Sequence, residues 1–233
     1  MSDRYQRLQV IGQGQSGVVH AGMDRLLGRP VAIKTMHRLG GQELYWLKRE
    51  FRCLAEFSHR NFVELYDLVV SDSDCFFTME LVEGKDFLRR FRTPGPDPQI
   101  DYDALRSALA EVASGLSALH AQHKLHRDLK PHNALVEDGG RVVILDFDLV
   151  LDTRSATSLR ESAMAGTPIY MSPEQLWGRP LSPASDWYSI GAMAFEVLTG
   201  EIPLTGERWS RAMQGDWNIP PASALAPATP HDL

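Results

Sequence analysis

The stretch H-R-D-L-K-P-H-N at residues 126–133 decides how this sequence folds. It matches the pattern H-R-D-L-x-x-x-N without a gap. A polar surface turn would have to reproduce five specified residues by chance: His126, Arg127, Asp128, Leu129 and Asn133. The match therefore sets which patterns are expected on either side of this stretch.

Two further patterns follow on its C-terminal side. Residues 146–148 read D-F-D after the apolar run V-V-I-L, one residue away from D-F-G. Residues 166–174 read G-T-P-I-Y-M-S-P-E, close to G-T-x-x-Y-x-A-P-E. Both patterns come in the order and at the spacing expected after the first.

A glycine-rich run, residues 12–19, lies on the N-terminal side and fits G-x-G-x-x-G-x-V. Glycines allow a backbone to approach phosphates with its N–H groups free to donate. A dinucleotide-binding fold needs a helix directly after the glycines, whereas here a strand pattern follows and then V-A-I-K at 31–34. This order argues against a Rossmann unit.

Together these motifs resemble the protein kinase family from Tyr5 to about Gly215. Lys130, two places after Asp128, is similar to the serine/threonine kinases, and residues 166–175 are similar to the bacterial members. The resemblance implies an α+β, two-lobed protein kinase fold. A small antiparallel β-sheet lobe with one helix would occupy residues 1–82, and a larger, mainly α-helical lobe residues 83–233.

The resemblance also implies roles in phosphoryl transfer from ATP. Asp128 would accept the proton of the substrate hydroxyl, and Lys130 would steady the γ-phosphate. Asn133 and Asp146 would hold Mg²⁺. One loop carrying a carboxylate, a cation and an amide suits this chemistry, because phosphoryl transfer depends on alignment and on neutralising charge on the phosphoryl oxygens.

Lys34 of V-A-I-K would bind the α- and β-phosphates and pair with a glutamate of the following helix. Glu50 lies in the middle of the helical pattern 42–57 and is the partner we expect. Glu43 lies near the start of that pattern, where the helix dipole favours a negative charge.

The backbone of Glu80 and Val82 would meet the adenine edge, and Asp86 would accept from the ribose. The full nucleotide-binding set that the resemblance implies is Ile11, Gly12, Gly14, Gly17, Val19, Ala32, Lys34, Met79, Glu80, Val82, Asp86 and Leu135.

Three expectations concern control and support of the site. Ser162 or its neighbours would be phosphorylated, and Arg127 would bind that phosphate. Asp148 stands where the family has glycine, and we expect it to restrict the flip of this segment without abolishing catalysis. Asp186 would tie a helix to the catalytic loop, cap that helix, or do both.

The implied activity is transfer of the ATP γ-phosphoryl group to Ser or Thr hydroxyls of a protein substrate. Two alternatives stay open: a non-catalytic kinase-like scaffold, suggested by Asp148, and a small-molecule phosphotransferase of related fold. The long segment ending in S-P-E and the presence of Lys130 favour a protein substrate.

The composition argues against one class of partner. The 233 residues include 24 Lys and Arg against 30 Asp and Glu, a net charge of −6. The chain therefore lacks the excess of basic residues that is typical of nucleic-acid-binding proteins. No run approaches the roughly 18 apolar residues of a membrane helix. The first ten residues lack the layout of a signal peptide, so the cytoplasm is the expected compartment.

Hydrophobic periodicity predicts the elements. We expect strands at 5–12, 17–22, 30–35, 62–70 and 75–81, a hairpin of 134–136 with 142–145, and helices at 42–57 and at 183–199 before Gly200. A further helix of about five turns is expected after a cap at Asp101, with one apolar stripe of Leu105, Leu109, Val112, Leu116 and Leu119. Residues 219–233 are expected to form a loop. By the resemblance, Glu174 would pair with an arginine that lies beyond the position of Leu233. We therefore expect roughly 40 residues of the larger lobe to be missing from this sequence. The parent protein is expected to be longer, with room for further domains.

Overall fold

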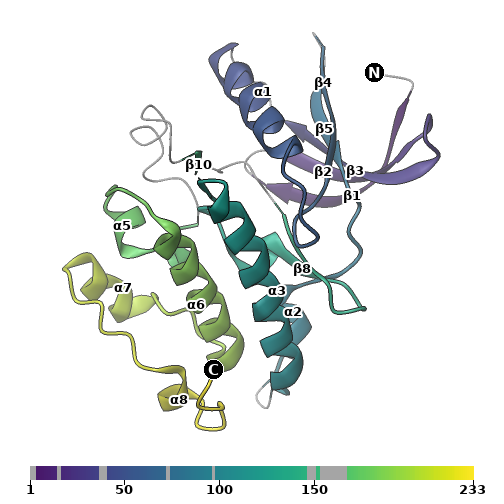
Figure 1. Ribbon diagram of the computed structural model, residues 1–233. Coiled ribbons are helices and arrows are strands. Elements are labelled where there is room, and N and C mark those ends of the chain that lie inside the picture. The colour runs from purple at the N-terminus through teal and green to yellow at the C-terminus, as the bar shows by residue number, and fades with distance from the viewer. Residues whose placement is uncertain are drawn as a thin grey trace. The chain divides into compact units, whose positions relative to one another are not determined.

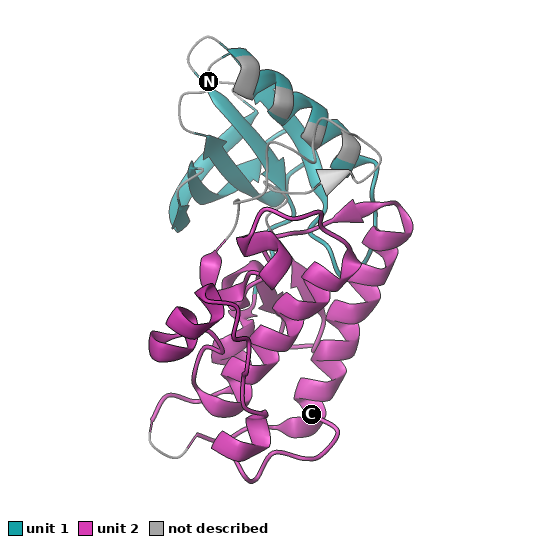
Figure 2. Ribbon diagram, turned by 90° about the vertical axis from the view of Figure 1, so that its left-hand side faces the viewer, with its two compact units in different colours: residues 1–83 teal, residues 84–233 magenta. Residues whose placement is uncertain are grey.

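The computed structural model describes residues 4–14, 17–36, 41–71, 74–95, 98–145, 151–152 and 167–233. It divides into two compact units, residues 1–83 and 84–233, shown in different colours in Figure 2. Asp146, Asp148 and Ser162, whose roles were predicted from the sequence, lie outside the described residues, as does the side chain of Glu50.

Unit 1 is built on one antiparallel sheet of five strands in the order β1-β2-β3-β5-β4. The strands are β1 (Tyr5–Gly14), β2 (Gly17–Asp24), β3 (Arg29–Met36), β4 (Leu65–Val70) and β5 (Cys75–Met79). The first three confirm the predicted runs and extend them by one or two residues. The prediction for 62–70 was too long, because the Phe62 N–H donates to the His59 carbonyl at 2.9 Å in a turn that precedes the strand.

The two faces of this sheet carry different residues. Side chains alternate along a strand, and directly opposed residues share a face. Val31 and Ile33 of β3 point to one face, where they form a buried cluster with Tyr5 and Phe76. Lys34, between Val19 of β2 and Phe77 of β5, therefore points to the other face.

Helix α1 (Gly41–Ala55) covers that second face. The ring of Phe51 lies 6.1 Å from the ring of Phe77, between centroids, and Leu54 is buried. The helix was predicted as 42–57 from its apolar spacing. It ends earlier, and the Phe57 N–H donates to the Leu54 carbonyl in the turn that follows.

Unit 2 is mainly helical. Its α-helices are α2 (Phe87–Phe91), α3 (Tyr102–Ala121), α5 (Pro173–Leu176), α6 (Pro183–Thr199), α7 (Gly206–Met213) and α8 (Ala222–Leu225). Its strands are β6 (Lys85–Asp86), β7 (Lys124–Leu125), β8 (Ala134–Val136), β9 (Val142–Ile144) and β10 (Leu151–Asp152), and two 3₁₀ turns are η1 (Pro131–Asn133) and η2 (Pro168–Tyr170). Strands β6, β8 and β9 form one small sheet and β7 pairs with β10.

The long helices α3 and α6 pack against each other and support the rest of the unit. The Asp101 carboxylate accepts from the Ala104 N–H at 3.0 Å, which confirms the predicted cap of α3. Helix α6 begins after Ser182, whose hydroxyl caps it, and ends at Gly200, where φ is 77°. Helix α6 matches its predicted bounds, and α3 buries the predicted stripe residues Leu105, Val112, Leu116 and Leu119.

One prediction in this unit was wrong. Residues 219–233 were expected to form a loop throughout, but Ala222–Leu225 form the single-turn helix α8. Pro221 stands just before this helix, and the Ala226 N–H closes its turn on the Ala222 carbonyl at 2.8 Å. One turn is too short to show an apolar period.

Among the described residues, no helix is long and apolar enough to cross a membrane.

Candidate active site

The candidate catalytic loop, residues 126–133, follows β7 in unit 2, includes η1 and leads into β8. Its central carboxylate, Asp128, is held on both oxygens. Oδ1 accepts from the Thr167 backbone N–H at 2.8 Å, and Oδ2 accepts from the Lys130 ammonium at 2.7 Å. The Lys130 ammonium also donates to the Thr167 hydroxyl at 2.8 Å. These contacts fix the carboxylate while leaving 11% of the side chain exposed.

Asn133 completes this group. Its amide nitrogen donates to the Asp128 backbone carbonyl at 2.8 Å and to Asp128 Oδ2 at 3.1 Å. Because the nitrogen makes both bonds, the amide oxygen is the atom left to face away from Asp128. An amide oxygen is a hard ligand of the kind Mg²⁺ prefers, so the orientation of Asn133 fits a metal.

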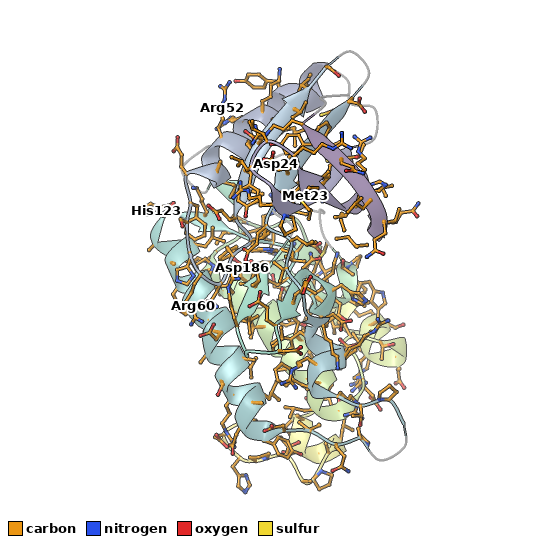
Figure 3. The ribbon with its side chains drawn as sticks, turned by 90° about the vertical axis from the view of Figure 1, so that its right-hand side faces the viewer. Met23, Asp24, Arg52, Arg60, His123 and Asp186 are labelled. Carbon is orange, nitrogen blue, oxygen red and sulfur yellow. The ribbon has the colours of Figure 1, made fainter. Side chains whose placement is uncertain are left out.

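Asp186, which is labelled in Figure 3, lies on α6 and binds the loop of residues 126–133. Its fully buried carboxylate accepts from the backbone N–H of His126 at 2.9 Å and of Arg127 at 2.8 Å. The His120 ring lies 2.7 Å from the same carboxylate. The structure thus shows the tie to the loop that was expected of Asp186, whereas the capping hydroxyl of α6 belongs to Ser182.

Thr167 is a residue of this site that sequence reasoning missed. Both its backbone N–H and its hydroxyl contact the pair of Asp128 and Lys130. The signal was available, since Thr167 is the second residue of the pattern at 166–174. Threonine in a loop carries no periodicity, and only the folded chain brings it beside residue 128.

The segment after Thr167 is anchored on α6. The Tyr170 hydroxyl donates to the Glu196 carboxylate at 2.6 Å, and Ser189 donates to the Tyr170 carbonyl at 2.9 Å. Burial, and then the neighbouring Glu196 carboxylate, raise the pKa of Tyr170 well above its ordinary value. The Ser185 hydroxyl of α6 donates to one carboxylate oxygen of Glu174 at 2.5 Å.

In unit 1 seven of the predicted nucleotide-binding residues share one face of the sheet. The pairs Gly12 with Val19, Val19 with Lys34, and Ala32 with Met79 are directly opposed. Strand alternation then places the whole group on the Lys34 face: Gly12, Gly14, Gly17, Val19, Ala32, Lys34 and Met79. The pairing shift between Val10 and Gly12 leaves Ile11 outside this register.

The glycines of the run 12–17 differ in what they need. A Cβ on Gly17 would lie 2.0 Å from the Thr35 carbonyl oxygen, so strand packing itself requires glycine there. A Cβ on Gly14 would meet nothing within 4 Å. Packing therefore explains Gly17, whereas the described structure leaves Gly14 free to serve a ligand.

Lys34 is buried, with 6% of its surface exposed, and its ammonium lies 5.9 Å from the centroid of the Phe77 ring. A buried ammonium group is costly without a partner. Glu50 is carried by α1, on the same face of the sheet, next to Phe51 in sequence.

The remaining predicted residues divide between the two units. Glu80 and Val82 follow β5 in unit 1, and the Glu80 N–H donates to the Glu64 carbonyl at 2.8 Å. Asp86 and Leu135 are paired across β6 and β8 in unit 2. Asp86 also caps α2, accepting from the Arg89 N–H at 3.0 Å, a structural task that sequence reasoning did not foresee.

Comparison with known proteins identifies the class. The family model described as "Protein kinase domain" matches residues 5–222, and the chain belongs to this family.

Individual relatives are bacterial. The chain is 36% identical over 235 residues to the serine/threonine-protein kinase PknL of Mycobacterium tuberculosis, covering 99% of this chain and 58% of that protein. It is 34% identical over 211 residues to the serine/threonine-protein kinase PrkC of Bacillus subtilis, covering 89% of this chain and 32% of PrkC. The chain therefore spans little more than half the length of the first relative and about a third of the second.

Proposed function

We propose that this chain is an ATP-dependent protein kinase that transfers the γ-phosphoryl group to Ser or Thr hydroxyls of protein substrates. The observation that carries the proposal is the convergence of Lys130, Thr167 and Asn133 on the carboxylate of Asp128. The names of the relatives, serine/threonine-protein kinases, support the same class of substrate.

Asp128 is the proposed catalytic base. It would orient the substrate hydroxyl and accept its proton as the oxygen attacks phosphorus. The backbone N–H on Oδ1 and the ammonium on Oδ2 hold the carboxylate in one orientation before the substrate arrives. Such alignment lowers the barrier because the geometry is fixed before the reaction.

Lys130 is proposed to serve both Asp128 and the transferred group. Its side chain is 24% exposed, so the ammonium can reach a phosphoryl oxygen as well as its two protein partners. A cation at this place offsets the negative charge on the equatorial oxygens.

Asn133 and Asp146 are the proposed magnesium ligands. The orientation of the Asn133 amide fits this role, and Asp146 lies outside the described residues. Mg²⁺, when bound, would neutralise charge on the nucleotide phosphates.

The Lys34 face of the unit 1 sheet is the proposed surface for ATP. Gly14 leaves its backbone open to phosphates, and Val19, Ala32 and Met79 would supply apolar contact for adenine. Lys34 would bind the α- and β-phosphates and Glu50 would orient it. The site would be completed by the backbone of Glu80 and Val82 and by Asp86 and Leu135.

We propose the cytoplasm, where ATP is available, as the compartment in which the protein acts.

Control by phosphorylation is part of the proposal. Ser162 or its neighbours would carry the phosphate, and the Arg127 guanidinium would bind it. Mass spectrometry of active protein should find phosphate in this segment, and an active protein without it would exclude this control.

The activity is tested with ATP labelled on the γ-phosphate. The label should pass to a general protein acceptor or to the chain itself, on Ser and Thr as shown by phosphoamino-acid analysis. Transfer to sugars or aminoglycosides in place of protein would show a small-molecule phosphotransferase. No transfer to any acceptor would show a non-catalytic scaffold.

A further inference from the structure

Arg127, which directly precedes the proposed base, has an unusual backbone. Its φ is 72°, in the left-handed region that residues with a side chain rarely adopt, and the residue is 3% exposed. This conformation costs free energy and persists only where the surroundings fix it. The residues that fix it therefore decide where Asp128 points.

Two buried side chains hold the two backbone polar groups of Arg127. The N–H donates to Asp186 Oδ1 at 2.8 Å, and the carbonyl accepts from the Gln175 side-chain amide at 2.7 Å. Asp186 is fully buried on α6 and Gln175 is 1% exposed on α5. One bond precedes the rotatable backbone bonds of Arg127 and the other follows them, so together they fix its left-handed angles.

We propose that Gln175 is a positioning residue for phosphoryl transfer, which acts through the Arg127 carbonyl to hold Asp128 in place. This inference rests on the proposed kinase activity. The Asp128 carboxylate has its own contacts with Lys130 and Thr167, but these bind only the side chain. Gln175 fixes the peptide group that leads into Asp128, and so the direction of its Cα–Cβ bond.

The test compares the wild-type full chain with Gln175→Met. Methionine keeps the length of the side chain but cannot donate a hydrogen bond. Val197→Ala is the control, because it shortens a fully buried side chain of α6 away from the loop and lowers stability without touching Arg127.

We expect kcat to fall on the order of tenfold in Gln175→Met, with the KM for ATP changed less than about twofold, because the loss is one of geometry at the base. Val197→Ala should lower the unfolding midpoint and leave kcat near the wild-type value. A kcat for Gln175→Met equal to that of Val197→Ala would overturn the inference.

Hydrogen exchange gives a readout that does not need activity. Amides in the peptide covering residues 124–133 should exchange faster in Gln175→Met than in the wild type or in Val197→Ala. If the wild type transfers no phosphoryl group, the proposed function fails, while this exchange comparison still decides the role of Gln175. Unchanged exchange in the loop would contradict that role.

Discussion

Replacing Asp186 by asparagine should destabilise the chain and impair the catalytic loop together. The wild-type carboxylate accepts the N–H groups of His126 and Arg127 on different oxygens, and it faces the His120 ring. Asparagine has one oxygen and one NH₂ group. Whichever way it turns, a buried backbone N–H of the loop faces another donor.

The magnitude follows from these contacts. Each buried donor left without an acceptor costs about 1–3 kcal/mol, and one loop N–H and the new NH₂ group compete for acceptors here, so we expect a loss of about 2–4 kcal/mol. Urea unfolding followed by circular dichroism measures this loss as a lower midpoint. Asp103→Asn on α3 is the control, because that side chain is 95% exposed and should change stability by less than about 0.5 kcal/mol.

The same variant should lose kcat, because the loop backbone that carries Asp128 is no longer fixed. If Asp186→Asn unfolds within about 0.5 kcal/mol of the wild type and keeps its kcat, then the buried hydrogen bonds do not support the loop and the reasoning is refuted.

Three further predictions concern single sites. Gly17→Ala should lower the free energy of unfolding by about 2 kcal/mol or more, because its Cβ would lie 2.0 Å from a carbonyl oxygen of β3. Gly14→Ala is the control and should be nearly neutral, because its Cβ would meet nothing within 4 Å. Equal urea midpoints for the two variants would contradict this prediction. The hydrogen bond from Arg4 lowers the pKa of Asp24 from 3.8 to about 2, so the ionised Asp24 stabilises the fold above about pH 4, and this stabilisation is lost as the pH falls toward 2. Urea midpoints measured between pH 5 and pH 2 should fall in the wild type and fall less in Asp24→Asn. Parallel pH curves for the two proteins would exclude this contribution. Thr167→Val keeps the backbone donor but removes the hydroxyl, and should reduce kcat by roughly three- to tenfold, or about 1 kcal/mol; an unchanged kcat would show that the hydroxyl is idle.

Much of the fold could be predicted because the long elements have strong periods and clear ends. The apolar stripe that includes Leu105, Val112 and Leu119 faces the core as expected, and helix α6 ends at Gly200 as a left-handed glycine requires. Short elements such as α8 contain too few residues for a period to be read. Their geometry follows from neighbours that lie far away in sequence.

The site was predictable as a set of residues but not as a set of contacts. The motif at 126–133 predicted Asp128, Lys130 and Asn133 as site residues, and the structure shows that these three side chains contact one another. The roles of Thr167 and Gln175 depend on contacts across 39 and 48 residues of sequence, which no local pattern encodes. The twofold use of Asp86, as helix cap and as paired neighbour of Leu135, was hidden for the same reason.

The most direct test of Asp128 as the catalytic base compares γ-phosphoryl transfer by the wild type, Asp128→Asn and Asp138→Asn. Asp138 lies exposed in the turn between β8 and β9, so its variant controls for loss of a carboxylate alone. We predict that Asp128→Asn loses about 10²- to 10⁴-fold in kcat, the range of a general base, while Asp138→Asn keeps the wild-type rate. Equal transfer by all three proteins would contradict it.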